Sequence, residues 1–259
     1  MSKLRVAIGE HLENCSQVIT LGVRSQISDY TREERELLRT ADIIFFPTTK
    51  FADLFATLGK VTYPSVNCYR LRGERLKHVA LLRMLKVPYP RTRVYYGQKQ
   101  KQKILEDFAF PFIAKNPLSS AIGKDVFLID NSPKLQWYNK KCNPAYIQEQ
   151  VIPQMELRVA VINYQKVFGS YRWIVGEDSR ASSDHGTEWQ TKNMPSEAIT
   201  LGKNIACQGS LSEVTVEMIF DGSQFQVVEL TFPYGQTETL HTGHERLRAI
   251  LEMIEGGEL

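Results

Sequence analysis

The sequence predicts an α/β fold, with lobes in which helices and strands are mixed. Its 259 residues are enough for two ordinary domains or one large one. The composition, 42% hydrophobic and 24% charged, is that of a globular protein and excludes a disordered or fibrous chain. Runs with helical spacing alternate with short β-rich runs, and no internal repeat or low-complexity linker interrupts them.

The first 70 residues are predicted to form a small α/β unit. Thr31 followed by Glu34 has the spacing of a capping box, in which each side chain binds the backbone N–H of the other residue. The helix that starts there is expected to run to about Thr40. The other elements expected in this unit are a strand at 43–46, a helix at 51–58 that ends at Gly59, and a strand at 61–64.

The clearest helix is expected from Gly73 to Lys86. Its apolar residues recur every three positions, and Pro88 and Pro90 follow it because proline cannot continue the helical ladder. Strands are then expected at 92–96, 108–115, 126–129, 146–149, 157–162 and 166–174, with a hairpin turn over Ile162–Lys166. A helix at 195–209, a hairpin of strands 214–220 and 225–230, and an amphipathic helix at 238–255 complete the chain.

The charge of the chain is nearly balanced, since 32 basic and 29 acidic side chains give a net charge of +3. This balance argues against a nucleic-acid partner bound through bulk electrostatics. No apolar run approaches the roughly 20 residues that span a bilayer. The N-terminal segment also lacks the apolar core of a signal peptide. We therefore expect a cytoplasmic protein that binds neither membranes nor nucleic acids.

Cysteine and histidine positions do not indicate a zinc site. The cysteines at 15, 68, 142 and 207 never stand in a Cys-x-x-Cys spacing, which excludes a zinc ribbon or a redox pair of that type. His241 and His244 share a helix face, but no further ligands stand near them in a zinc pattern. We interpret these residues as ordinary thiols and polar side chains.

The last predicted hairpin carries two carboxylates. Glu217 and Glu229 stand 12 positions apart, and Thr231 shares a strand face with Glu229. If the two glutamates pair directly, Gly222–Gln224 form a three-residue turn. Opposed carboxylates repel each other unless water solvates them or a cation bridges them, and Mg²⁺ prefers such oxygens together with phosphates. A metal site and a pair of solvated glutamates are equally weighted interpretations of this hairpin.

A second feature runs from Phe110 to Ile129. Lys115 ends an apolar strand, a loop of small residues with Ser119, Ser120 and Gly123 follows, and a second apolar strand comes next. Such a flap can place backbone N–H groups over phosphates while the lysine adds a positive charge. The flap lacks the Walker spacing, so it is not a P-loop. An ordinary hairpin is the alternative interpretation.

A third feature is the run Tyr146–Val151, followed by Glu156 and Arg158. A carboxylate at a strand end beside exposed backbone, such as Glu149, can bind an amino group or ribose hydroxyls. An edge strand at the protein surface is the alternative interpretation.

Taken together and in this order, the three features resemble the ATP-grasp superfamily, and within it the RimK-type and glutathione-synthase-like ligases. The resemblance runs from about Arg72 to Glu255. Glu74–Leu76 and Val87–Thr92 are similar to the family's Asp-Lys helix and its Gly-Ile-Pro-x-Pro-x-Thr strand entry. The implied ATP-grasp fold has three parts. They are a small α/β pre-ATP-grasp domain at 1–71, a lobe with the helix and phosphate flap at 72–145, and a lobe with the adenine hinge and metal hairpin at 146–259.

The resemblance also implies a role for each candidate residue. Lys115 is similar to the family's nucleotide-binding and catalytic lysine, and Arg172 to a catalytic arginine that faces the substrate or the phosphate. The other nucleotide-binding residues that the family pattern implies are Arg75, Ser119, Ser120, Gly123, Glu149, Val151 and Glu156, the last at the ribose. The implied metal ligands are Glu217, Glu229 and Thr231.

The chain departs from the family pattern at several of these positions. Arg75 stands where lysine is usual, Glu217 where aspartate is usual, and Thr231 where asparagine is usual. The flap has a single glycine, and the asparagine expected after Arg180 is missing. These changes bear on a second metal ion and on the position of the γ-phosphate more than on nucleotide binding.

The activity implied by the resemblance is ATP- and Mg²⁺-dependent ligation of a carboxylate to an amine. The reaction passes through an acyl phosphate and releases ADP and phosphate, with Mn²⁺ as the alternative metal. The substrates would be small molecules, peptides or a protein tail, chosen by the N-terminal domain and the loop Ser179–Trp189, and a homo-oligomer is a family-level expectation. Two alternatives stay open: an ATP-dependent carboxylate kinase on the same scaffold, and a catalytically weakened nucleotide-binding module.

Overall fold

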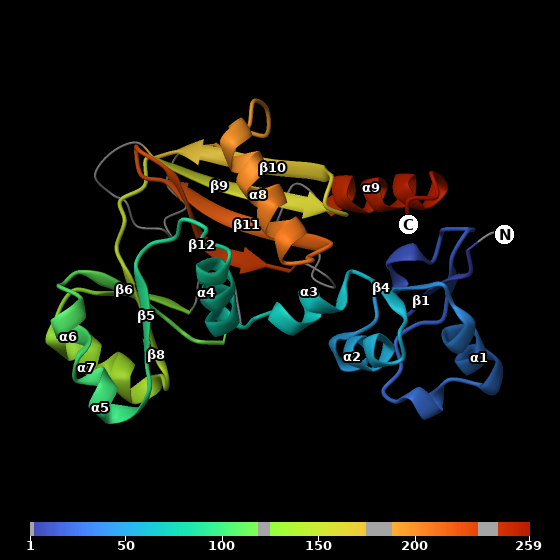
Figure 1. Cartoon of the computed structure of the whole chain (residues 1–259), viewed down its shortest axis with the longest axis horizontal. Coiled ribbons are helices and arrows are strands. Elements are labelled where there is room, and N and C mark those ends of the chain that lie inside the picture. The colour runs from blue at the N-terminus through green and yellow to red at the C-terminus, as the bar shows by residue number, and fades with distance from the viewer. Residues whose placement is uncertain (1–2, 119–124, 175–187, 233–242) are drawn as a thin grey trace.

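The computed structural model describes residues 3–118, 125–174, 188–232 and 243–259 (Figure 1). The strands of these residues form three four-stranded sheets, which we call the N-terminal, middle and C-terminal sheets in chain order. Helices pack on each of them, so the mixed α/β fold class predicted from the sequence is confirmed. Within the described ranges, no helix combines the length and the apolar character needed to cross a membrane.

The N-terminal sheet is parallel and has the order β2-β1-β3-β4. Its elements are β1 (Arg5–Ala7), the 3-10 helix η1 (Glu10–Leu12), β2 (Ile19–Thr20), the 3-10 helix η2 (Ile27–Asp29), α1 (Arg32–Thr40), β3 (Ile43–Phe45), α2 (Thr49–Thr57) and β4 (Val61–Tyr63). The predicted capping box starts α1. Thr31 Oγ1 accepts from Glu34 N at 3.2 Å, and Glu34 Oε2 accepts from Thr31 N at 2.7 Å. The sequence missed β1 and β2 because strands this short show no alternation.

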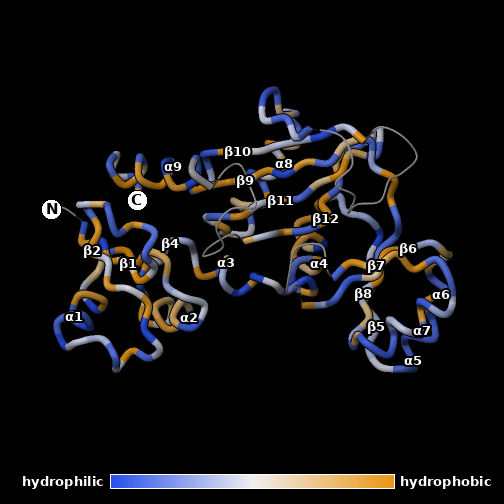
Figure 2. Tube along the Cα trace, turned by 180° about the vertical axis from the view of Figure 1, so that it is seen from behind, coloured by the Kyte–Doolittle hydropathy of each residue, from blue (hydrophilic) through white to orange (hydrophobic). Residues whose placement is uncertain are grey.

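The helix α9 (Gly243–Glu255) packs on the N-terminal sheet. Its residues Ile250 and Ile254 share a buried core with Phe45 and Tyr63. Figure 2 shows hydrophobic and hydrophilic residues mixed along α9. The same core also includes Ile162, and Phe168 packs against it. Both ends of the chain therefore build the core of the N-terminal unit, while the domain limits given above stay a prediction. The predicted start of this helix, at 238–242, lies outside the described residues.

The middle sheet is antiparallel and has the order β5-β8-β6-β7. This part of the chain comprises α3 (Val66–Leu71), α4 (Arg75–Met84), β5 (Thr92–Tyr95), α5 (Gly97–Lys101), α6 (Ile104–Asp107), β6 (Phe112–Lys115), β7 (Val126–Ile129), α7 (Ser132–Lys141) and β8 (Ala145–Glu149). The predicted strand 108–115 is wrong before Phe112, because Phe108 N still bonds the carbonyl of Ile104 and Pro111 has no N–H for a ladder. The sequence also missed α3, α5, α6 and α7, which are short or mostly polar.

The C-terminal sheet is antiparallel and has the order β10-β9-β11-β12. Its elements are β9 (Met155–Ile162), β10 (Lys166–Trp173), α8 (Ser196–Gln208), β11 (Glu213–Phe220) and β12 (Phe225–Thr231), close to the predicted ranges. Leu157 and Val159 of β9 lie in a core that α4 and α8 also line. Side chains alternate along a strand, so Glu156 and Arg158 lie on the opposite face, together with Glu217 of β11. We call this side of the sheet the polar face.

Candidate nucleotide and metal site

The two glutamates of the last hairpin lie directly opposite each other. The pairing of β11 with β12 sets Glu217 against Glu229. On its other side, Glu217 pairs with Arg158 of β9. A guanidinium and two carboxylates therefore share one row of the polar face across three strands.

The turn of this hairpin differs from the prediction. Phe220 pairs with Phe225, so the loop Asp221–Gln224 has four residues rather than three. The Asp221 side chain favours the longer loop, because it accepts from the backbone N–H of Gln224 at 2.9 Å. A β-bulge farther along the hairpin then shifts the pairing by one residue. The opposition of the two glutamates depends on this bulge, which the sequence pattern did not reveal.

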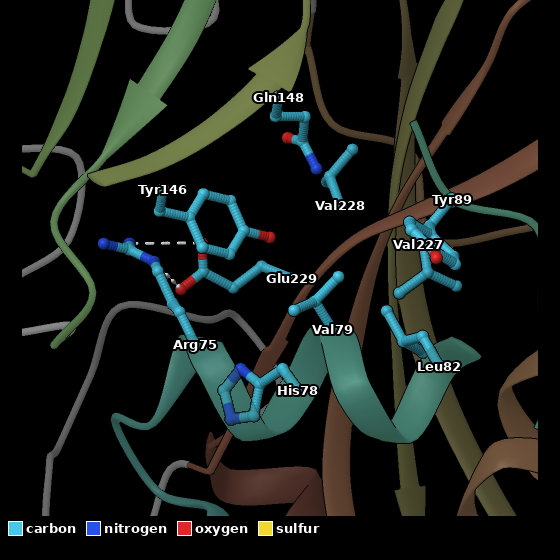
Figure 3. A pocket seen from close by; sticks show the side chains of 10 residues that line it. All are labelled: Arg75, His78, Val79, Leu82, Tyr89, Tyr146, Gln148, Val227, Val228 and Glu229. Carbon is cyan, nitrogen blue, oxygen red and sulfur yellow. Dashed lines mark hydrogen bonds and ion pairs between the residues drawn. The ribbon is translucent and has the colours of Figure 1, made fainter. Parts of the chain in front are cut away.

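Arg75, the first residue of α4, forms an ion pair with Glu229 (Figure 3). Its Nε donates to Oε1 at 2.9 Å and its Nη2 donates to Oε2 at 3.2 Å. Its Nη1 donates to the carbonyl of Asn116, just after β6, at 2.9 Å. The Arg75 and Glu229 side chains are 5% and 12% exposed. Such a charge-assisted fork fixes the carboxylate in both position and orientation, and it connects the start of α4 with the middle and C-terminal sheets.

Lys115, the last residue of β6, lies close to the Arg75–Glu229 pair. Its Nζ donates to the carbonyl of Val228 at 3.0 Å and stands 3.9 Å from Glu229 Oε2. Burial lowers the pKa of Lys115, and the negative charge of Glu229 opposes that shift. The sequence places Lys115 at the end of an apolar strand, and the structure brings it within reach of the opposed glutamates.

Among the described residues, Glu217 has fewer hydrogen-bond partners than Glu229. Burial raises its pKa, the neighbouring charge of Glu229 raises it further, and Arg158 lowers it. No hydrogen-bond donor among the described residues reaches its carboxylate oxygens, whereas Arg75 binds both oxygens of Glu229. A cation that bridged the pair would relieve this repulsion.

The residues present fit a Mg²⁺ ion that arrives with a nucleotide. Mg²⁺ is usually held by one or two carboxylates, with phosphates and water completing its shell, and Glu217 and Glu229 would supply the carboxylates. Thr231 Oγ1 is 3.5 Å from the carbonyl of Thr215, in the next row of the same strand pair. Within the described ranges, no three His, Cys, Asp or Glu side chains gather as a complete metal site.

A second ion pair lies at the far end of the polar face. Arg172 of β10 pairs directly with Glu156 of β9. Its Nε donates to Glu156 Oε2 at 2.7 Å, and its Nη2 forms an ion pair with the same oxygen at 2.6 Å. Both side chains are mostly buried, at 16% and 17% exposure. Trp189, the last residue of the loop expected to help choose the substrates, places its ring near Arg172 and Arg158. Its only signal in the sequence is a tryptophan within a polar segment.

The predicted adenine hinge lies at the end of β8. The Glu149 carboxylate accepts from the backbone N–H of Arg91 at 2.5 Å. The neighbouring side chains Tyr146 and Gln148 are the ones that line a small pocket with Glu229 (Figure 3). The alternation of side chains along β8 could have identified them, since Tyr146 and Gln148 share one face. Val151 follows β8 and is half-buried.

His78, one turn after Arg75 on α4, also lines this pocket (Figure 3). Its Nε2 lies 2.6 Å from the carbonyl of Leu71, and burial lowers its pKa. A neutral ring that donates from Nε2 to this carbonyl satisfies both observations. The flap residues Ser119, Ser120 and Gly123 lie outside the described residues.

Comparison with known proteins shows the family and the fold of the chain. The family model described as RimK-like ATP-grasp domain matches residues 73–253. No curated protein matches the chain. The chain is similar in structure to macrocyclase MdnC from Microcystis aeruginosa MRC, bound with precursor peptide MdnA, at 13% identity and a TM-score of 0.67, over 96% of this chain and 97% of that one.

Two further solved structures share the fold. The ATP-grasp ligase PsnB, complexed with a minimal precursor, Mg and ADP, is 12% identical with a TM-score of 0.65, over 98% of this chain and 97% of that one. The carboxyaminoimidazole ribonucleotide synthase from Aspergillus clavatus, complexed with ATP, is 17% identical with a TM-score of 0.64, over 97% of this chain and 77% of that one. The family match spans most of the sequence, and the chain therefore belongs to the RimK-like ATP-grasp family.

Proposed function

We propose that the protein is an ATP- and Mg²⁺-dependent ligase that joins a carboxylate to an amine through an acyl phosphate. The observation that supports this most is the buried group of Arg75, Lys115, Glu217 and Glu229 where α4, β6 and the last hairpin meet. Two cations beside two opposed carboxylates suit a triphosphate that brings its own metal ion.

The proposed reaction has two steps. An oxygen of the substrate carboxylate forms a bond to the γ-phosphorus of ATP, the bond to the bridging oxygen breaks, and ADP leaves. The amine then attacks the acyl carbon and loses a proton, and phosphate leaves with the electrons of the broken C–O bond. When bound, Mg²⁺ supplies positive charge to the phosphate oxygens.

The side chains contribute positioning and charge rather than a covalent intermediate. Lys115 and Arg75 would bind phosphate oxygens, and Arg172 would hold the transferring group or the acid. Glu217 and Glu229 would hold the metal ion, with Thr231 nearby. Ser119, Ser120, Gly123, Glu149, Val151 and Glu156 remain the proposed contacts of the nucleotide.

The substrates are proposed as a class. Solved structures with this fold are bound to a precursor peptide or a minimal precursor in two cases, and to ADP and an aminoimidazole ribonucleotide in another. For this chain we therefore propose a small-molecule, peptide or protein-tail carboxylate and an amine. A cytoplasmic location, a homo-oligomer and Mn²⁺ as a substitute metal are part of the same proposal.

The test is ATP turnover over a panel of acids and amines, with Mg²⁺ and hydroxylamine present. Formation of ADP together with a hydroxamate supports acyl-phosphate chemistry, because hydroxylamine traps the activated acid. Formation of AMP instead of ADP would contradict the mechanism. A hydroxamate with no amide from any amine would favour a carboxylate kinase.

A second candidate function is a nucleotide-binding module without turnover. Arg75 already neutralises Glu229, and Thr231 offers a hydroxyl where the family usually has an amide oxygen. This candidate predicts that ATP raises the melting temperature while no acid in the panel promotes ADP formation.

A further inference from the structure

Trp189 lies against two arginines of the polar face. The centre of its ring is 4.7 Å from the guanidinium carbon of Arg158 and 5.0 Å from that of Arg172. Both distances are within the range in which a cation is attracted to an aromatic ring. The two arginines come from neighbouring strands, so the indole is a single contact that joins β9 and β10.

The backbone explains why Trp189 lies on this face. Its neighbour Gln190 forms a bridge with Tyr171 of β10, with N–H···O distances of 2.9 and 2.8 Å in the two directions. Opposed residues of an antiparallel pair share a face, and Tyr171 belongs to the buried core side of the sheet. Side chains alternate, so Trp189 lies on the opposite side, which is the polar face.

The two arginines flank the proposed transfer site from different rows. Arg158 shares a row with Glu217, and Arg172 shares the next row along β9 with Glu156. Glu156 holds the Arg172 guanidinium from one side, and Trp189 contacts it as well. For Arg158 the Trp189 ring is the cation–π contact that orients it beside the unsatisfied carboxylate of Glu217.

Building on the proposed function, we propose that Trp189 is a positioning residue for the phosphoryl transfer. Its indole holds the guanidinium groups of Arg158 and Arg172 on the polar face, where they meet the negative charge of the transferring phosphoryl group. An ordered cation lowers the barrier more than a mobile one because less reorganisation is needed during the reaction. Stacking on a ring uses no N–H groups, so the N–H groups of Arg172 that do not engage Glu156 can still meet phosphate oxygens.

The first test compares Trp189 with Trp173, which lies on β10 beside Arg172 but is 48% exposed and contributes no such contact within the described residues. Replacing Trp189 by Ala should lower kcat for ADP formation by about 10- to 100-fold, since two cation–π contacts are lost. The KM for ATP should stay within about threefold. Trp189→Phe should restore most of the rate, and Trp173→Ala should leave it unchanged. Full activity of Trp189→Ala, or an equal loss in Trp173→Ala, would overturn the proposal.

The second test needs no turnover. In a variant with Trp137→Phe and Trp173→Phe, Trp189 is the sole tryptophan. Addition of inorganic phosphate to this protein with ADP and Mg²⁺ should change the tryptophan emission, and Arg172→Gln should abolish the change. Unchanged emission would overturn the role of Trp189, whether or not phosphate raises the melting temperature. A phosphate-dependent change without turnover on any acid would instead contradict the ligase activity, and only the ordering of Arg158 and Arg172 by Trp189 at a phosphate site would stand.

Discussion

Arg75 and Glu229 form a buried ion pair that joins the start of α4 to β12, although they are 154 positions apart in the sequence. The guanidinium engages both carboxylate oxygens and the carbonyl of Asn116. Glu229 is therefore held in one orientation, and its negative charge is balanced, while the opposed Glu217 has no such partner among the described residues. Because the two glutamates differ in this way, we expect different effects from changes at Arg75, Glu229, Lys115 and Glu217.

Removing the positive charge of Arg75 should strongly destabilise the fold. Arg75→Met leaves the mostly buried Glu229 without its fork, and breaking a buried pair costs about 3 kcal/mol or more. The matched control is Arg70→Met, since the Arg70–Asp53 pair is 51% and 62% exposed and surface pairs contribute about 1 kcal/mol or less. Urea unfolding of both variants measures the difference. Equal losses of unfolding free energy would contradict the importance of the Arg75–Glu229 pair.

Neutralising Glu229 should lower turnover strongly, and it should also lower stability because the buried Arg75 loses its ionised partner. Glu229→Gln preserves the shape of the side chain but withdraws one proposed metal ligand, so ADP formation should fall by about a hundredfold or more. Glu197→Gln, an exposed change on α8, serves as the control and should leave the rate unchanged. Steady-state assays across a range of Mg²⁺ concentrations would show the effect. A Glu229→Gln variant with the activity of the control would remove Glu229 from the metal site.

Lys115 should matter for nucleotide binding more than other buried lysines do. Lys115→Met removes a buried cation that stands 3.9 Å from Glu229 Oε2, so the rise in melting temperature caused by ATP should disappear. Lys101 is also buried, at 5% exposure, and its Nζ donates to the carbonyls of Asn139 and Cys142. Lys101→Met should therefore lower stability but retain the ATP response. Thermal melting with and without ATP at about 100 times its Kd, where binding adds about 2.7 kcal/mol, tests this contrast.

The raised pKa of Glu217 should make stability depend on pH. Burial and the charge of Glu229 raise this pKa above the ordinary value of 4.5, so the folded chain binds more protons than the unfolded chain between 4.5 and the raised value. The stabilisation is then fully present below pH 4.5 and is lost as the pH rises through the raised pKa. Glu217→Gln cannot ionise, so it should gain stability relative to the unmodified protein as the pH increases. The free energy of unfolding of both proteins can be measured with urea from about pH 4 to about pH 8. Its dependence on pH should differ between the two proteins. The same dependence in both would contradict the raised pKa of Glu217.

Local patterns in the sequence identified the elements with strong periodicity or clear end signals. The helix α4 was predicted from the spacing of its apolar residues and from the prolines that follow it, and β9 to β12 from the length of their β-rich runs and the hairpin turns between them. The capping box at Thr31 also fixes the start of α1. Short or polar elements such as β2, α5 and α7 were not predicted, because a few residues carry too little periodicity to distinguish a helix or strand from a turn.

The candidate site was predictable only in part. The spacing of Glu217 and Glu229 allowed a direct pairing, which the structure shows, and Lys115 was predicted at the end of an apolar strand, where β6 ends. The bulge that completes the glutamate pair and the contact of Glu149 with Arg91 could not be predicted from the sequence. Each of them depends on which strand neighbours which, and that information is absent from any single segment.

The sequence by itself determined the order of the three chemical features and the alternation that divides the C-terminal sheet into a core side and a polar face. It thereby determined the family. The tertiary structure alone decided which charges meet: Arg75 with Glu229, and Trp189 with Arg158 and Arg172. It also decided that α9 completes the core of the N-terminal unit. The physical reason is that hydrophobic periodicity acts over a few residues, whereas ion pairs and ring contacts form between segments that come together only when the chain has folded.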